Sequence, residues 1–376
     1  MKIEDGFLDE FESMEDPRIE RCKLHPMQEI LFLTICGVLC GCESWEDFEV
    51  FGESKLDFLK EYLPYKNGIP SDDTLRRFYR ALNPKKFQEC FVGWMKRFQI
   101  QTSQGVIAID GKTSRRTHDG SQQALHLVSA FASEARLVLA QQKVLDHSNE
   151  ITAIPEILNW LEIRGSLVSI DAMGCQTDIA EKIRIQGGDY LLGLKGNQGT
   201  LLEDVREFFE SELASADPVH AIHSTQEVDK GHGRLEKRKC SVCSEIEWLK
   251  ERHPRWKDLA AIVRVEAERT LGAGTSRDIR YYLTSRCSGP GEMLAATRSH
   301  WSVENSLHWV LDMSFGDDYC RIRKEHAPLN MAIIKHIAVN MIRNSKAKSK
   351  RMSVRRLRKK AGWDHDLLRL LIAQNL

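Results

Sequence analysis

The spacing of apolar residues changes from helical to extended near residue 105. Before that point the apolar positions recur every three to four residues, as expected for helices that pack on a core. The expected helices cover residues 27–40, ESWEDFEVFG at 43–52 and SKLDFLKEYL at 54–63. The pattern therefore predicts an N-terminal helical domain over residues 1–100.

A further helix is expected after Pro70 and Ser71, which together form a helix-start signal. Its polar side bears Arg76, Arg77 and Arg80. This pattern is typical of the second helix of a helix-turn-helix, whose side chains contact DNA. It is equally typical of an ordinary amphipathic helix, so both interpretations stay open.

From residue 105 onwards short apolar runs alternate with helical segments. Helical patterns over 151–165 and 176–186 separate the last three of five runs: GVIAID (105–110), LHLVSAFA (125–132), RLVLAQQKVL (136–145), SLVSID (166–171) and GDYLLGLKG (188–196). Three strands followed by helix, strand, helix and strand predict an α/β domain. We expect an RNase H-like fold, with a mixed five-stranded sheet flanked by helices, over residues 101–345.

The segment from about 219 to 286 is strand-like again, after a helix over 200–214. It contains a KGHGR turn between two alternating runs, so we expect a β-rich insertion in the α/β domain. His232 and Arg234 in this turn would contact the substrate backbone, or they belong to a plain hairpin turn with two glycines.

Charge is balanced overall but unevenly distributed. The chain has 376 residues, with 54 basic and 54 acidic side chains, so net charge identifies no partner. The first twenty residues are rich in acids, whereas 343–360 carries basic charges only. We expect a basic tail over 346–376, either solvated or bound to a phosphate backbone.

The sequence disfavours a membrane-spanning protein and a small protein held together by disulfides. The longest apolar run, residues 30–42, is shorter than the roughly 20 residues that span a bilayer, and no signal-peptide pattern precedes it. We expect a buried helix in a cytoplasmic protein without a membrane partner. Ten cysteines in a chain of this length do not indicate a disulfide scaffold, and the single Cys240/Cys243 pair is weak evidence for zinc.

Two aspartates end apolar strands that the pattern places in the sheet core. These are Asp110 in GVIAID and Asp171 in SLVSID. A single such residue is usually a cap or a turn former. On neighbouring strands the two carboxylates would face each other, where like charges repel unless a cation lies between them. Hard carboxylate oxygens favour Mg²⁺, with Mn²⁺ as a substitute.

A third carboxylate stands in HWSVENSLHWVLD, residues 300–312. At helical spacing Glu304 shares a face with His300, Val303 and Leu307. A buried carboxylate needs a cationic partner, and a third acid would complete a two-metal site for phosphoryl transfer. The alternative is a helix rotated by one residue, which leaves Glu304 solvated.

Five motifs occur in the same order as in insertion-sequence transposases of the DDE class. They are VIAIDGKT, LVSIDAMGCQ, YLLGLKGNQGTL, KGHGRLEKR and HWSVENSLHWVLDMSFGDDYCRIRKEHAPLN. The chain most resembles the H-repeat-associated transposase family, over nearly its whole length. The resemblance implies a triad of Asp110, Asp171 and Glu304 with two Mg²⁺ ions. It also implies metal-dependent cleavage of element ends, transfer of the 3′ hydroxyl to target DNA, and a homodimer on double-stranded DNA.

One departure concerns the residues around the third acid. The wider superfamily has a Tyr-x2-Arg-x3-Glu-x6-Lys pattern, whereas this chain has Thr297, His300, Glu304 and Leu311 at those places. Imidazole titrates near neutrality, so His300 is not a permanently charged phosphate clamp. Two interpretations stay open, a side chain that packs in the core and one that contacts DNA. Other candidate DNA contacts are Lys112, Lys195, Asn197, Arg321, Arg323 and Lys324, and an ordinary polar turn explains Lys195 and Asn197 equally well.

Two competing functions share these motifs. One is an RNase H-like nuclease that hydrolyses without joining, and the other is a catalytically inactive, transposase-derived DNA-binding protein. Three intact acids favour the enzyme. We expect it in the bacterial cytoplasm, associated with the nucleoid when it acts.

Overall fold

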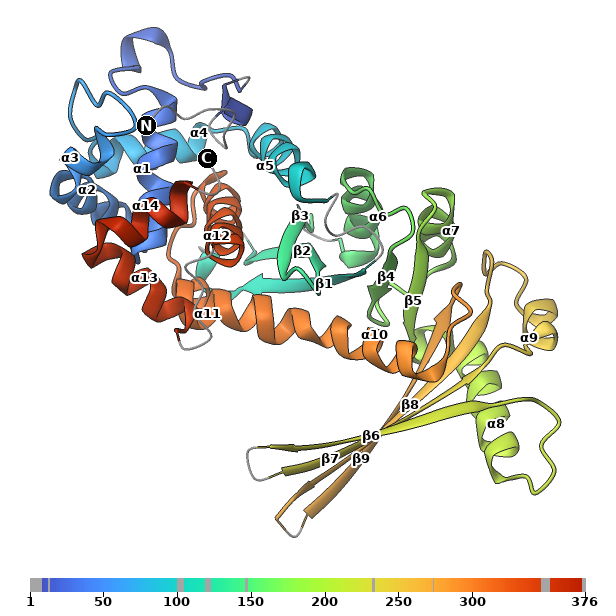
Figure 1. Cartoon of the computed structure of the whole chain (residues 1–376). Helices are drawn as coiled ribbons and strands as arrows, with labels where there is room; N and C mark the ends of the chain where they lie inside the picture. The colour runs from blue at the N-terminus through green and yellow to red at the C-terminus, as the bar shows by residue number, and fades with distance from the viewer. Residues whose placement is uncertain are drawn as a thin grey trace.

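The structure is a computed structural model that describes residues 9–12, 14–99, 105–118, 123–145, 148–231, 234–272, 274–345 and 352–373. A β-sheet with flanking helices forms one part of the molecule, and a helical body forms another (Figure 1). A long pair of hairpins projects from the sheet as an arm.

The described strands form one nine-stranded sheet in the order β3-β2-β1-β4-β5-β9-β8-β7-β6. β4 pairs in parallel with β1 and β5, and the other pairs are antiparallel. The strands are β1 (Val106–Ser114), β2 (Leu125–Ala132), β3 (Leu137–Lys143), β4 (Leu167–Ile170), β5 (Asp189–Leu194), β6 (His223–Gly231), β7 (Arg234–Cys243), β8 (Ala261–Leu271) and β9 (Gly274–Thr284).

The five predicted core strands are all present, but the prediction of a five-stranded sheet is wrong. The β-rich insertion is confirmed, and its four strands continue the same sheet. β9 pairs with β5 from Leu191 opposite Thr284 to Leu194 opposite Tyr281. This pairing satisfies backbone groups that would be unpaired if β5 were an edge strand. Hydrophobic spacing within a strand does not show which distant strand it pairs with.

Helices cover both faces of the core sheet. α6 (Glu150–Trp160) and α7 (Thr177–Ile185) lie on one face, and α10 (Pro290–Val303) crosses the other (Figure 1). α8 (Gly199–Ala214) and the short α9 (Glu247–Arg252) accompany the insertion. Short 3₁₀ turns are η1 (Asp9–Phe11), η2 (Glu20–Cys22), η3 (Arg115–Thr117), η4 (Gly196–Gln198) and η6 (Asp317–Tyr319).

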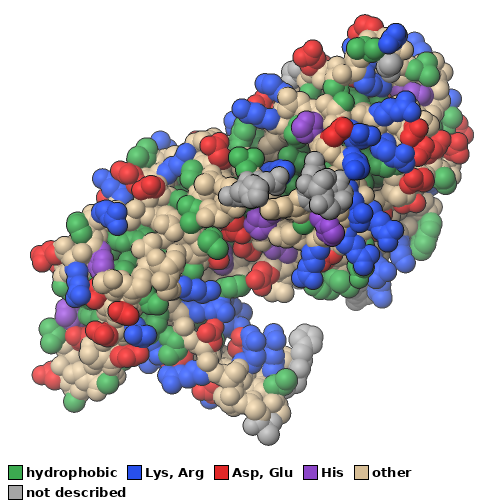
Figure 2. Space-filling view, turned by 180° about the vertical axis from the view of Figure 1, so that it is seen from behind, with side chains coloured by type: hydrophobic (Ala, Val, Ile, Leu, Met, Phe, Trp, Pro, Cys, Tyr) green, Lys and Arg blue, Asp and Glu red, His purple; other side chains and the backbone are tan. Residues whose placement is uncertain are grey.

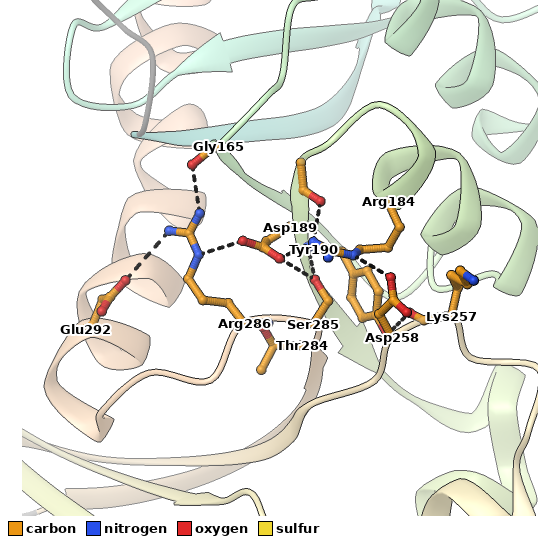
Figure 3. Close-up of polar contacts among 11 residues, drawn as sticks. Gly165, Arg184, Asp189, Tyr190, Lys257, Asp258, Thr284, Ser285, Arg286 and Glu292 are labelled. Carbon is orange, nitrogen blue, oxygen red and sulfur yellow. Dashed lines mark hydrogen bonds and ion pairs between the residues drawn. The ribbon is translucent and has the colours of Figure 1, made fainter.

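A polar network fastens the insertion to the core where β9 ends (Figure 3). Asp189 at the start of β5 accepts hydrogen bonds from Arg184, from Ser285 Oγ at 2.9 Å and from Arg286 Nε at 3.0 Å. Arg286 also donates to the Gly165 carbonyl at 2.8 Å. Two arginines on one partly buried carboxylate make charge-assisted bonds, so the arm and α10 start from an anchored point.

The helical body combines segments from both ends of the chain. α1 is buried along almost its whole length and packs against α12, α13 and α14, which confirms the predicted buried helix. No single helix among the described residues has the length and apolarity to cross a membrane, although the α1–α2 pair, bent by 95°, passes that test when taken together. The body comprises α1 (Met27–Cys40), α2 (Trp45–Ser54), α3 (Leu56–Leu59), α4 (Asp72–Ala81), α5 (Pro84–Gln99), α12 (Ala327–Asn344), α13 (Val354–Trp363) and α14 (His365–Ala373).

The C-terminal segment differs from the expected basic tail. Its described part, 352–373, forms α13 and α14, and Leu357 and Ala361 are buried against the helical body. Arg358 is 3% exposed, donates from Nε to the Val38 carbonyl at 2.8 Å, and stacks 4.1 Å from the Phe315 ring. An amphipathic spacing within the basic run explains the difference, because the apolar positions recur on one face.

Candidate active site

Asp110 lies on β1, and Asp171 directly follows the neighbouring strand β4 at the same level of the sheet. The parallel β1–β4 register runs to Ile109 opposite Ile170, so the next residue on each chain is an aspartate. β4 ends at Ile170, whereas β1 continues to Ser114 by pairing with β2. The sequence predicts Asp110 at the end of its strand, but it lies within β1. The prediction that the two acids lie side by side agrees with the register.

The two aspartates lie in a strongly negative, partly buried environment. Burial, followed by the charges of Asp171, Glu150 and Glu304, raises the pKa of Asp110 to about 7, against a hydrogen bond from the Gly111 backbone. Burial and then Glu150 also raise the pKa of Asp171, while backbone hydrogen bonds and Lys195 oppose the rise. Such repulsion is relieved when a cation binds between the acids.

Glu304 begins a π-helical turn. α10 ends at Val303, the turn η5 covers Glu304–His308, and α11 (Trp309–Phe315) follows. Val303 and Leu307 are buried, whereas Glu304 is exposed. The prediction that Glu304 shares their buried face is therefore wrong. Its exposure agrees with the alternative, in which Glu304 is solvated. Single π turns occur frequently at functional sites. The charge of Glu304 nevertheless acts on Asp110.

The histidines of this helix are neutral. His300 is 4% exposed, and burial lowers its pKa to about 4. It therefore lies in the interior and is no cationic clamp. His308 lies with Nδ1 3.6 Å from Asp110 Oδ2, and burial, followed by the charge of Lys112, lowers its pKa to about 4 as well. Trp309, the residue after His308, is 58% exposed.

Lys112 lies in an internal acidic cluster. Its side chain is 10% exposed, and Nζ lies 2.6 Å from Asp312 and 3.5 Å from Asp317. Asp317 also accepts from Lys335 Nζ at 2.8 Å and from Ser114 Oγ at 2.6 Å. Burial would raise the pKa of Asp317, but Lys335, Lys112 and Ser114 outweigh it and hold that pKa well below its usual range. The cluster thus links β1 to α11, η6 and α12.

A hollow of about 570 Å³ lies between the insertion sheet and α10, beside Glu304. Figure 2 shows Lys and Arg side chains around the hollow where the arm leaves the body. Arg280 stacks over Trp301 at 4.3 Å, and ion pairs to Asp229 and Glu227 offset part of the charge. Five arginines line this groove, which we call the insertion groove: Arg234, Arg238, Arg269, Arg280 and Arg298. His232 lies outside the described residues.

Of the remaining predicted DNA contacts, Lys195 and Asn197 lie near Asp171, whereas Arg323 has another partner. Asn197 donates to the Ala172 carbonyl at 2.7 Å, which holds the loop after Asp171, and Lys195 is exposed nearby. Arg323 donates to the Arg116 carbonyl at 2.8 Å, while Arg321 and Lys324 are exposed.

On α4, the predicted N-cap Ser71 is confirmed by its hydrogen bond from Thr74 N. The arginines of this helix form surface ion pairs. Arg76 and Arg77 pair with Asp73, and Arg80 pairs with Glu325 at 2.7 Å. Such exposed pairs are weak, so they leave these side chains available to a phosphate.

Glu150 is an acidic neighbour that the sequence patterns do not single out. It starts α6, and its charge acts on both aspartates. An acid in the first turn of a helix is commonplace, so its type and position alone carry no functional signal. The pairing of β1 with β4, together with the packing of α6, makes it a neighbour of the site.

The chemistry of the donor set fits Mg²⁺ or Mn²⁺, because Asp110, Asp171 and Glu304 all offer hard carboxylate oxygens. Burial, together with neighbouring acids, raises the pKa of Asp110 and of Asp171, and a bound cation would offset that cost. As the side chains stand, the described residues contain no group of three His, Cys, Asp or Glu arranged to hold a metal ion.

Comparison with known proteins covers nearly the whole chain. Residues 101–341 match the family model described as Transposase DDE domain, and residues 8–95 match the model described as DDE_Tnp_1-associated. The chain is 42% identical over 355 residues to the "H repeat-associated putative transposase YhhI" of Escherichia coli K12, covering 93% of each chain. It is 40% identical to the "Putative transposase YncI" of Escherichia coli O157:H7, covering 94% of this chain and 91% of the relative. A short relative, 56% identical over 54 residues (14% of this chain, 64% of the relative), is named "Inactive transposase YbfQ" of Escherichia coli K12.

Proposed function

The chain belongs to the family of transposases with a DDE domain, and on this premise we propose that it cleaves DNA at element ends and joins the freed 3′ hydroxyl to target DNA. The observation that carries the proposal is the register that puts Asp110 beside Asp171, with the charge of Glu304 acting on the same site. An RNase H-like fold, which the family implies, is consistent with the order of β1 to β5.

Each acid has a role in this proposal. Asp110 and Asp171 would hold the divalent cations, two Mg²⁺ or Mn²⁺ ions, and Glu304 would complete the site from η5. When bound, such ions activate a water or hydroxyl and stabilise the leaving oxygen at a phosphodiester. Because Glu304 is exposed beside the insertion groove, it is open to a DNA strand lying there.

Double-stranded DNA is the proposed partner. The arginines of the insertion groove can bind phosphates, and binding of this kind is largely electrostatic. Bringing two element ends together favours a homodimer. We place the reaction in the bacterial cytoplasm, at the nucleoid, without a membrane partner.

The test replaces each acid with its amide, which keeps the shape of the side chain and removes its charge. Asp110→Asn, Asp171→Asn and Glu304→Gln should each abolish Mg²⁺-dependent cleavage of end-bearing DNA, because the cation loses a ligand. DNA binding, measured by fluorescence anisotropy, should stay within about twofold of wild type, since phosphate contacts lie elsewhere.

The matched control is Asp178→Asn on α7, whose carboxylate is exposed and should be dispensable. Cleavage at the wild-type rate by a triad variant would remove that residue from the proposed site.

The nuclease alternative differs only in the joining step. A supercoiled target incubated with pre-cut ends in Mg²⁺ should yield joined product if the proposal holds. Hydrolysis without joined product would favour the nuclease. DNA binding without cleavage or joining would favour a catalytically inactive DNA-binding protein. One short relative is named an inactive transposase.

A further inference from the structure

The carboxylate of Glu150 packs directly on the strand that carries Asp110. A Cβ added to Gly111, the next residue of β1, would lie 2.1 Å from Glu150 Oε1 and 2.6 Å from its Cδ. No side chain can adopt such a separation, so only glycine at 111 lets Glu150 approach the β1 backbone. The DGK motif therefore contains a glycine whose space is filled by an acid from another element.

Glu150 is held in this place by β2 and by its own helix. His126 Nε2 lies 2.9 Å from Glu150 Oε1, and His126 Nδ1 lies 2.7 Å from Thr113 Oγ1. If the Thr113 hydroxyl donates to Nδ1, then Nε2 carries the proton and donates to Glu150. Asn149 caps α6 by accepting from Ile151 N at 3.1 Å, and the helix start favours an anion.

The placement is electrostatically costly without a cation. Glu150 packs against Gly111, the residue after Asp110, and the β1–β4 register brings Asp171 beside Asp110. The Glu150 side chain is 20% exposed, so water screens the repulsion only in part. A fourth acid fixed beside two others is destabilising in the protein alone and becomes favourable when a divalent cation binds.

We propose that Glu150 is a fourth acidic residue of the site, which strengthens divalent-cation binding by Asp110 and Asp171, with Gly111 and His126 holding it in position. It acts as a positioning residue, because Mg²⁺ keeps several water ligands and Glu150 can accept a hydrogen bond from one of them. This inference rests on the proposed function, since it assumes that the two aspartates bind the cation.

The test measures Mn²⁺ binding to the full-length protein by electron paramagnetic resonance of free Mn²⁺, without DNA and without an activity assay. Glu150→Gln keeps the shape of the side chain but removes its charge, and should weaken Mn²⁺ affinity about tenfold, as the loss of an outer-shell partner does. Glu150→Asp should restore part of the affinity. The matched control, Glu156→Gln, changes an exposed acid of the same helix and should bind like wild type.

His126→Gln is the second variant, because it keeps the acid and removes its anchor, and a smaller loss of affinity is expected. Wild-type affinity in both Glu150→Gln and His126→Gln, alongside lost binding in Asp110→Asn, would overturn this inference alone. Unchanged Mn²⁺ binding in Asp110→Asn would overturn the proposed site and this inference together. Melting temperatures in EDTA show whether each variant is folded.

Discussion

At the scale of single residues, the acids of the site oppose folding. Asp110 is mostly buried and has negative neighbours, which raises its pKa to about 7. Its pKa in the unfolded chain is about 3.9. The folded protein therefore binds a proton that the unfolded chain releases. The stability that protonated Asp110 contributes is fully present below about pH 4 and is lost as the pH rises through about 7.

Asp110→Asn should consequently become more stable than wild type as the pH rises. Three pH units correspond to roughly 4 kcal/mol. Because the side chain is 20% exposed and screened, we expect on the order of 2 kcal/mol at pH 8. Urea unfolding at pH 4.5 and pH 8 in EDTA measures the effect. A difference in unfolding free energy that does not change with pH would contradict it.

At the scale of elements, the acidic cluster around Lys112 and Asp317 fastens β1 to the helix that carries Glu304. The Lys112–Asp312 pair joins β1 to α11, and Lys335–Asp317 joins α12 to η6. Because α11 continues directly from η5, the cluster restrains the position of Glu304 relative to Asp110. This role differs from the DNA contact that the sequence suggests for Lys112.

Lys112→Met separates the two roles. It leaves Asp312 without a nearby cation and Asp317 with Lys335 as its remaining cation. Removing one partner of a buried ion pair typically costs about 3 kcal/mol, and the loss should appear in the free energy of unfolding. Lys86→Met is the control, because the Lys86–Glu89 pair is exposed and its loss should cost less than about 1 kcal/mol. Unchanged stability together with weaker DNA binding would restore Lys112 as a DNA contact.

At the scale of the whole molecule, the insertion strands β7, β8 and β9 form one wall of the insertion groove and α10 forms the other. β9 pairs in antiparallel fashion with β5, and α10 follows β9 in the chain, so arginines distant in the sequence face one hollow next to Glu304. The network at Asp189 anchors this geometry (Figure 3).

Arg298→Ala should weaken binding to DNA of any sequence and lower the slope of log affinity against log salt by about 0.9, the value for one phosphate contact on duplex DNA. Fluorescence anisotropy at salt concentrations from about 50 to about 200 mM measures the slope. Arg369→Ala on α14, where the arginine pairs with Glu61 at 2.7 Å, is the control. Equal slopes in both variants would remove Arg298 from the DNA surface.

The sequence by itself determined the elements and the identity of the paired acids. Apolar spacing is a local property, so the five core strands, α6, α7 and the buried α1 follow from it, and the strand pattern also singles out Asp110 and Asp171. Tertiary structure decided everything that depends on contacts between distant segments. It placed Glu304 on the exposed side of a π turn, joined the insertion to β5, directed Lys112 inward and brought Glu150 onto Gly111. The reason is physical, because burial and charge environment arise only when elements far apart in the chain pack together.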